Sequence, residues 1–183
     1  DALMLSGETS VGAHPFAAVR TMARIIENTE DQGLHRIRPL GTRPNSKGGA
    51  VTAAAAEIGE LLGVKYLITF TTSGDSTRRL SRVRPRIPML AFTPNQATRS
   101  QLALTWGVET FLVDDARHTD EMAMQVDEVL LAAGRVVEGD NVIIVAGSPP
   151  GIPGSTNALR VHRIGDAKNR VAPAYIDIAR GGA

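Results

Sequence analysis

From residue 47 onward the chain alternates short apolar runs with segments of helical periodicity, and this alternation constrains the fold more than any other feature. The helical segments carry apolar residues on one face, and most of them stop at a glycine. The apolar runs that predict strands are residues 66–70, 88–92, 108–113, 141–146 and 157–164. Strands alternating with helices of this length indicate a mostly parallel sheet covered on both faces. We therefore expect a three-layer α/β/α domain with a mostly parallel five-stranded sheet over residues 47–165.

The first 46 residues predict a different arrangement. Residues 2–5 are continuously apolar, as in a parallel strand buried on both faces. A helix is expected from Pro15 to about residue 29, since proline suits the first helical position. Residues 1–30 thus predict a single βα unit without the neighbouring strands that it needs, so we expect the sequence to begin inside a domain. Residues 31–46 are rich in Gly, Pro and Arg and predict a linker.

Composition and charge argue against several classes of function. The chain has 183 residues, no cysteine and a formal net charge of +1. The absence of cysteine excludes disulfides, thiolate metal sites and cysteine nucleophiles, and it fits a reducing cytoplasm. The small net charge gives no attraction to nucleic acid or to a membrane surface, and no apolar run reaches the roughly 20 residues of a membrane span. The four histidines are scattered without metal-ligand spacing, so no metal site is expected; they are His14, His35, His118 and His162.

A hydroxyl-rich loop after the strand at 66–70 is the most informative stretch. It consists of Thr71, Thr72, Ser73, Gly74, Asp75 and Ser76. Ligands of open α/β sheets bind at the carboxyl ends of strands, and the start of a helix favours an anion. This composition is typical of a phosphate cradle, although it lacks the Gly-Lys-Ser/Thr ending of a Walker loop. The alternative is an ordinary turn in which Asp75 or Ser76 caps the helix.

A second loop follows the strand at 141–146 and should lie at the same edge of the sheet. It consists of Gly147, Ser148, Pro149, Pro150, Gly151, Ile152, Pro153, Gly154 and Ser155. Prolines limit its freedom while glycines permit tight turns, which suits a lid over a ligand. A plain connector is the alternative.

Arg78 and Arg82 share a helix face and could reach an anion, but a solvated helix face is the favoured interpretation of this pair. The remaining tail, residues 166–183, shows no pattern and is expected to be loose.

Several segments, taken together and in order, resemble the pyruvate kinase family. The stretch from Asp1 to Thr9, with Pro15 and residues 18–20, resembles the last βα unit of that family's barrel. The 71–76 loop, Arg-Pro-Arg-Ile-Pro at 84–88, Thr93, Gly-Asp at 139–140 and Gly-Ser-Thr-Asn at 154–157 resemble its C-terminal domain. The resemblance covers residues 1 to about 165 and is strongest to actinobacterial members.

This resemblance implies a homotetrameric glycolytic enzyme that transfers phosphate from phosphoenolpyruvate to ADP, using Mg²⁺ and usually K⁺. The residues for that chemistry would lie in earlier barrel strands, so this chain alone is expected to be non-catalytic and to bind no cofactor itself. The segment that would border the active site at the barrel mouth is Ser6, Gly7, Glu8 and Thr9.

The family's C-terminal domain holds an allosteric effector, and the resemblance places it at the two loops. Thr71, Thr72, Ser73, Gly74 and Ser76 would hold one phosphate, and residues 147–155 would close over the ligand. Thr72 and Asp75 stand where bisphosphate-responsive members often have basic residues, and Met122 stands where some animal forms have an arginine. We therefore expect a monophosphate effector, such as glucose 6-phosphate or AMP, rather than fructose 1,6-bisphosphate. The strand at 157–164 is the candidate for pairing between subunits.

Two alternatives remain open at this point. The 71–76 loop also resembles the Ser-x-Ser-Gly-x-Thr loop of sugar-isomerase domains, which would make the chain a phosphosugar-binding module that stands alone. A sugar-isomerase domain would not explain the Asp1–Thr9 segment, whereas the end of a barrel would. A purely structural or oligomerisation domain, in which neither loop binds a ligand, is the other alternative.

Overall fold

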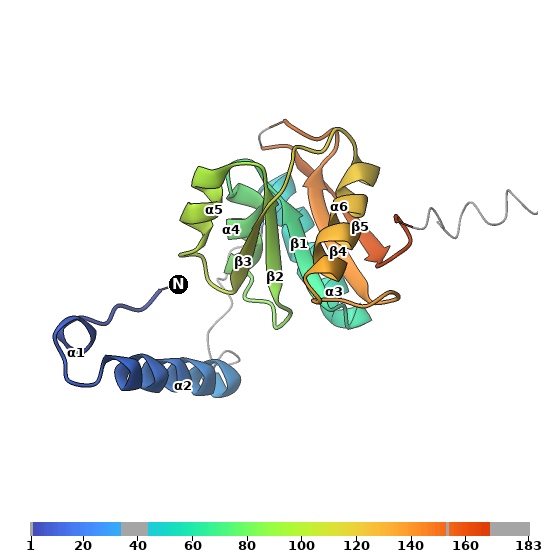
Figure 1. Cartoon of the computed structure of the whole chain (residues 1–183). Helices are drawn as coiled ribbons and strands as arrows, with labels where there is room; N and C mark the ends of the chain where they lie inside the picture. Colours follow the sequence, from blue (N-terminus) through green and yellow to red (C-terminus); the bar gives the residue numbers. More distant parts are fainter. Residues whose placement is uncertain (1, 34–43, 153, 169–183) are drawn as a thin grey trace, which may run out of the picture. The chain divides into compact units, whose positions relative to one another are not determined.

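The computed structural model describes residues 2–33, 44–152 and 154–168 (Figure 1). The chain divides into two compact units, Asp1–Thr42 and Arg43–Ala183. Most of the predicted linker and tail, residues 34–43 and 169–183, lies outside the described residues.

The first unit contains a short helix, α1 (Gly7–Ser10), and a long one, α2 (Pro15–Gly33). Helix α2 begins at Pro15, as predicted, and continues to Gly33, so residues 31–33 are helical although the sequence predicts a linker there. Residues 2–5 do not form the expected strand, and the described part of this unit offers no other strand with which they could pair. A parallel strand needs a hydrogen-bonded neighbour, which explains the difference.

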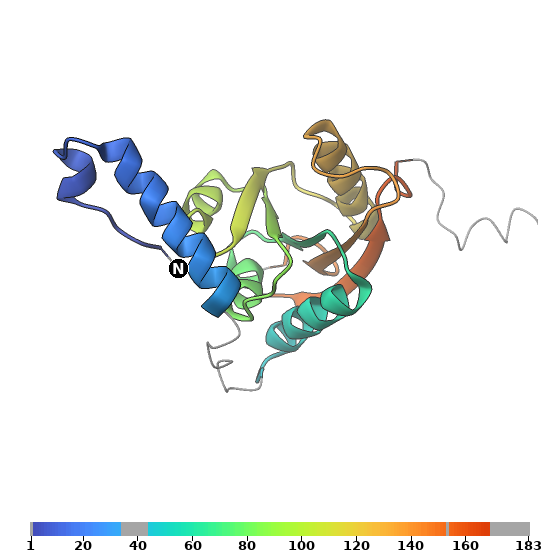
Figure 2. The same ribbon diagram turned by 90° about the horizontal axis from the view of Figure 1, so that it is seen from below.

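The second unit is built on one five-stranded sheet with the strand order β3-β2-β1-β4-β5 (Figures 1 and 2). Its elements in chain order are α3 (Lys47–Leu62), β1 (Tyr66–Phe70), α4 (Asp75–Arg82), β2 (Met89–Thr93), α5 (Gln96–Leu102), β3 (Val108–Leu112), α6 (Thr119–Ala132), β4 (Asn141–Gly147) and β5 (Thr156–Arg163). Strands β1 to β4 are parallel, and β5 pairs with β4 in the antiparallel sense. The predicted mostly parallel five-stranded sheet is therefore confirmed.

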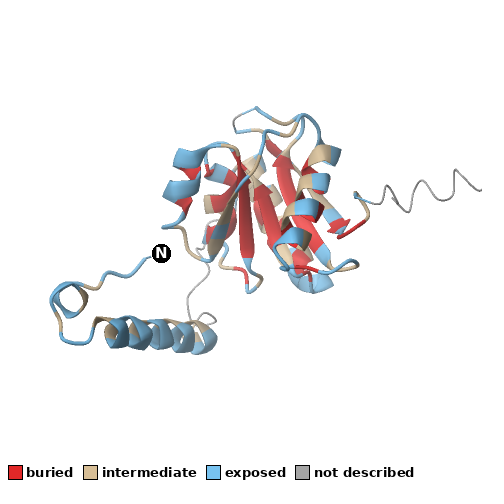
Figure 3. Cartoon of the chain, viewed as in Figure 1, coloured by how far each residue is buried: buried red, intermediate tan, exposed pale blue. Residues whose placement is uncertain are grey.

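The central strands of this sheet are buried (Figure 3), and apolar residues pack against both of its faces. On one face α6 packs against strand residues that include Ile68 and Ile144. On the other face α3 and α4 pack against residues that include Leu67 and Ile143. Neighbouring residues of a strand point to opposite faces, so each central strand contributes to both cores. The result is the expected three-layer arrangement.

The alanine-rich sequence of α3 allows this helix to lie close to the sheet. Ala55 and Ala56 are buried, and a side chain at Gly59 would bring its Cβ to 2.7 Å from Leu67 Cδ2. The helix begins where the Ser46 hydroxyl accepts a hydrogen bond from the Gly49 N–H at 3.2 Å. It ends at Gly63 in the left-handed conformation. Of the helices in the described ranges, none combines the length and apolarity needed to cross a membrane.

Candidate ligand-binding site

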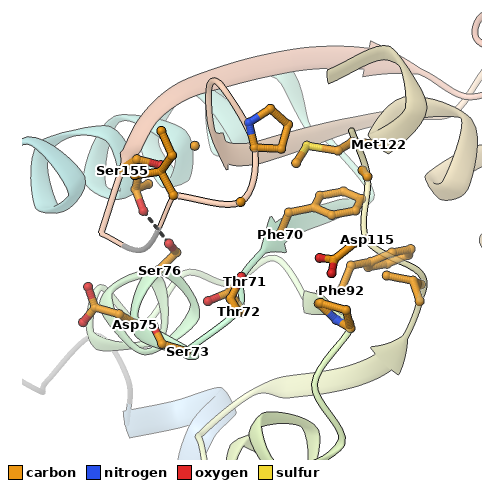
Figure 4. Close-up of a pocket in the computed structure, with 18 of the residues that line it drawn as sticks. Phe70, Thr71, Thr72, Ser73, Asp75, Ser76, Phe92, Asp115, Met122 and Ser155 are labelled. Carbon is orange, nitrogen blue, oxygen red and sulfur yellow. Dashed lines mark hydrogen bonds between the residues drawn. The ribbon is translucent and has the colours of Figure 1, made fainter. Parts of the chain in front are cut away.

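The sheet order brings the two predicted loops together. Strands β1 and β4 are neighbours, and the chain leaves their carboxyl ends through the β1–α4 loop and the β4–β5 loop. In open α/β sheets such a point, where the strand order reverses, is where ligands bind. A pocket lies there, lined by Phe70, Thr71, Thr72, Ser73, Asp75, Ser76, Phe92, Pro94, Val113, Asp114, Asp115, Ala116, Met122, Gly147, Pro150, Gly151, Ile152, Gly154, Ser155 and Thr156 (Figure 4).

The β1–α4 loop is shaped by its own side chains. The Thr71 hydroxyl accepts a hydrogen bond from the Gly74 N–H at 2.9 Å, which closes the turn before α4. Gly74 adopts φ +84°, a left-handed conformation that costs a residue with a side chain about 1–2 kcal/mol. The first N–H groups of α4, those of Asp75, Ser76 and Thr77, have no carbonyl within the helix to bind. They and the positive end of the helix dipole favour an anion at this end of the pocket.

A hydrogen bond between two hydroxyls joins this loop to the β4–β5 loop. Ser76 Oγ lies 2.5 Å from Thr156 Oγ1, and both side chains are buried (Figure 4). Gly147 lies so close to Ser155 that a Cβ at this position would collide with the Ser155 hydroxyl. Asn157 holds the loop closed, because its side chain accepts from the Ser148 N–H and donates to the Ser148 carbonyl, each at 2.7 Å. The two loops thus form one hydroxyl-bearing wall.

The arginines of α4 do not line the pocket, and two of them hold the loop. Arg78 Nη1 donates to the Ser73 carbonyl at 3.0 Å. Arg79 Nε donates to the Asp75 carboxylate at 2.7 Å, which pairs the charge of that residue. Arg82 is exposed and lies outside the pocket lining. The prediction that Arg78 and Arg82 reach an anion therefore finds no support, and the lining residues include no lysine or arginine.

On the opposite side of the pocket, Met122 is the position already compared with an arginine of some animal forms, whereas the other residues were not predicted from the sequence. Phe70 and Phe92 are in ring contact, with centroids 5.2 Å apart, and Met122 and Asp115 lie beside them (Figure 4). The carboxylates of Asp114 and Asp115 follow β3, at the same edge of the sheet as the hydroxyl-rich loop. Their position directly after a predicted strand was a usable signal, because carboxyl ends of parallel strands share one edge.

Other predicted site residues have different positions. Ser148 and Pro149 belong to the β4–β5 loop but do not line the pocket, and Pro153 lies outside the described residues. The segment Ser6–Thr9 belongs to the first unit, where the Ser6 carbonyl accepts the hydrogen bonds that start α1. Within the described ranges, no three His, Cys, Asp or Glu residues are grouped so that they could hold a metal ion.

Sequence and structure comparisons agree on the family. The profile of the family described as "Pyruvate kinase, alpha/beta domain" matches residues 49–162. The chain is 54% identical over 166 residues to pyruvate kinase from Mycobacterium tuberculosis and 48% identical to that from Corynebacterium glutamicum, in each case over 91% of this chain. These matches cover 35% and 34% of the two relatives, so the chain spans about a third of their length.

A solved structure of similar fold is a pyruvate kinase from Cryptosporidium parvum. It has a TM-score of 0.76 and 26% sequence identity, and the match covers 88% of this chain and 32% of that one. The mycobacterial and corynebacterial relatives are both actinobacterial, as the sequence resemblance suggested. The chain belongs to the pyruvate kinase family and carries its C-terminal alpha/beta domain.

Proposed function

We propose that this chain is the regulatory part of a pyruvate kinase and that its pocket binds a phosphorylated effector with one phosphate group. The observation that carries the proposal is the meeting of the β1–α4 and β4–β5 loops in one pocket at the start of α4. Hydroxyls of Thr72, Ser73 and Ser155 and the free N–H groups of α4 supply donors for phosphate oxygens. The absence of lysine and arginine from the lining favours a single phosphate over two.

The effector would act by linkage between this pocket and the active site of the whole enzyme. A ligand that binds one quaternary state better shifts the equilibrium toward that state, typically by about 1–3 kcal/mol. Such coupling requires contacts between subunits. Strand β5 is an edge strand of the sheet, and its Val161 side chain is 47% exposed. We propose that β5 contributes to the subunit contacts of a homotetramer.

Phosphoryl transfer from phosphoenolpyruvate to ADP would belong to the longer enzyme, together with its Mg²⁺ and K⁺ sites. This chain alone should give no pyruvate from phosphoenolpyruvate and ADP in a coupled assay. The sugar-isomerase alternative shares the hydroxyl-rich loop with this proposal, but the family match over residues 49–162 favours pyruvate kinase. A purely structural domain would bind neither a sugar phosphate nor a nucleotide.

Isothermal titration of the 183-residue chain with glucose 6-phosphate, AMP and fructose 1,6-bisphosphate tests the effector proposal. Thr72→Glu places a carboxylate on the pocket wall and should weaken binding of the monophosphate by roughly tenfold or more, because like charges repel at short range. Ser100→Glu introduces the same charge on the exposed side of α5 and is the matched control. Equal affinities of the two variants, or tight binding of the bisphosphate alone by the unmodified chain, would contradict the proposal.

The subunit contact is tested separately by light scattering after size-exclusion chromatography. Val161→Glu should lower the mass of any oligomer, because a charge would enter the proposed β5 contact. Val137→Glu changes another exposed valine, 64% accessible and outside β5, and should leave the mass unchanged. A mass that responds equally to both substitutions would rule out a specific role of β5.

A further inference from the structure

The pocket has two chemically different ends. Ser73, Ser76 and Ser155 lie on one side, at the start of α4 (Figure 4). Asp115 lies on the other side, next to Phe70 and Phe92 (Figure 4). One end therefore suits an anion, whereas the other presents a carboxylate beside an apolar surface.

The carboxylates at the second end are not neutralised by neighbouring side chains. Within the described parts of the chain, neither Asp114 nor Asp115 forms an ion pair. The third lining carboxylate, that of Asp75, differs because Arg79 binds it. Asp114 and Asp115 thus leave two uncompensated negative charges at this end of the pocket.

The backbone that carries these carboxylates is held in place by α6. Gln125 of α6 donates a hydrogen bond from Nε2 to the Asp114 carbonyl at 3.0 Å. Met122, one turn earlier on the same helix, is buried and lines the pocket. The backbone of the acidic end is thus held by a packed helix, while the side chains of Asp114 and Asp115 remain exposed and accessible to a ligand.

We propose that Asp114 and Asp115 are the specificity determinants of this pocket and that they reject ligands with a second phosphate. A carboxylate accepts hydrogen bonds from hydroxyl or amino groups, and it repels a phosphate at the same place. The pocket therefore selects a phosphomonoester whose other end is uncharged and bears donors, as in a sugar monophosphate or a nucleoside monophosphate. The half-buried ring of Phe70, which packs on the fully buried Phe92, suits the face of a sugar ring or a base. This inference rests on the effector proposal and adds the residues that set its selectivity.

The test compares the affinities of three ligands for three forms of the chain by isothermal titration. The forms are the unmodified chain, Asp114→Asn/Asp115→Asn, and Glu57→Gln/Glu128→Gln. The last changes the net charge by the same amount at exposed positions of α3 and α6 outside the pocket lining. The ligands are glucose 6-phosphate and fructose 1,6-bisphosphate, and AMP distinguishes a nucleotide from a sugar.

The double asparagine variant should bind the bisphosphate roughly tenfold or more tightly than the unmodified chain does. Its affinity for glucose 6-phosphate should change much less, because each asparagine keeps one acceptor oxygen. The glutamine control should alter both affinities by the same small factor. Added salt should reduce the difference between the variant and the unmodified chain, since screening weakens charge repulsion.

Two failures are distinguishable. If no monophosphate binds the unmodified chain, the effector proposal itself fails. If a monophosphate binds but the ratio of the two affinities stays the same in the asparagine variant, only the role of Asp114 and Asp115 is refuted. If circular dichroism shows that the double variant does not fold, Asp115→Asn alone replaces it. This single variant should shift the ratio of the two affinities in the same direction.

Discussion

Two aspartates of α6 pair with residues of β5, and the structure predicts very different costs for removing them. The carboxylate of Asp127 lies 2.8 Å from His162 Nε2, and the two side chains are 0% and 1% exposed. It also accepts a hydrogen bond from the Lys168 N–H at 3.0 Å. The carboxylate of Asp120 lies 3.0 Å from Arg160 Nη1, but its side chain is 81% exposed.

The Asp127→Ala variant should lose about 3–5 kcal/mol of unfolding free energy, because it leaves the buried ring and the N–H without an acceptor. The Asp120→Ala variant should lose only about 0.2–1 kcal/mol, because water solvates the released arginine. Removing both His162 and Asp127 should cost less than the sum of the single losses, since each substitution removes the other's partner.

Urea unfolding followed by fluorescence measures these differences. The chain contains a single tryptophan, Trp106, which lies in the second unit just before β3. Circular dichroism over the same urea series checks that both probes report one transition. Losses for Asp127→Ala and Asp120→Ala that agree within about 1 kcal/mol would refute the argument from burial.

Three further predictions concern single positions. Gly74→Ala should destabilise the domain by about 1–2 kcal/mol in urea, because φ is +84° there; a loss below the measurement error would contradict this. A hydrogen bond from Lys65 keeps the pKa of Asp140 below its usual value. The ionised Asp140 carboxylate therefore stabilises the folded chain at neutral pH, and this contribution is lost as the pH falls below about 4. The stability difference between the unmodified chain and Asp140→Asn, followed by acid titration, should shrink over that range. Gly147→Ala should lower the free energy of unfolding by about 1–3 kcal/mol through its clash with the Ser155 side chain. Adding Ser155→Gly should restore part of this loss; if it restores none, the clash with Ser155 is not the cause.

Local pattern was sufficient to predict most of the second unit. The runs at 66–70 and 141–146 form β1 and β4 with at most one residue of difference, because strands buried on both faces are continuously apolar. The antiparallel direction of β5 could not be predicted from the sequence pattern, because it depends on how the loop at residues 147–155 turns the chain back. Residues 2–5 show the limit of the same rule, because an apolar run becomes a strand only where a partner strand is present.

The hydroxyl half of the pocket was predictable from one loop, whereas its acidic half required the strand order as well as the position of the aspartates after a strand. Thr72, Ser73 and Ser76 belong to a single loop, so their composition alone indicated an anion site. Asp114 and Asp115 come from a strand two positions away in the sheet, and only the order β3-β2-β1-β4 brings them to the same pocket. Their role depends on distances between loops, which no local pattern contains.

The two α6–β5 pairs also connect the pocket with one edge of the sheet. Arg160 and His162 are two residues apart on β5, and their partners Asp120 and Asp127 are seven residues apart on α6. These spacings correspond to about 7 Å along a strand and about 10 Å along a helix, so sliding either element by one repeat would mismatch both pairs at once. The buried Asp127–His162 pair therefore links helix α6, which carries Met122 into the pocket, to edge strand β5, whereas the exposed Asp120–Arg160 pair adds little. A ligand that displaces α6 at Met122 would therefore have to move β5 with the helix or disturb this buried pair.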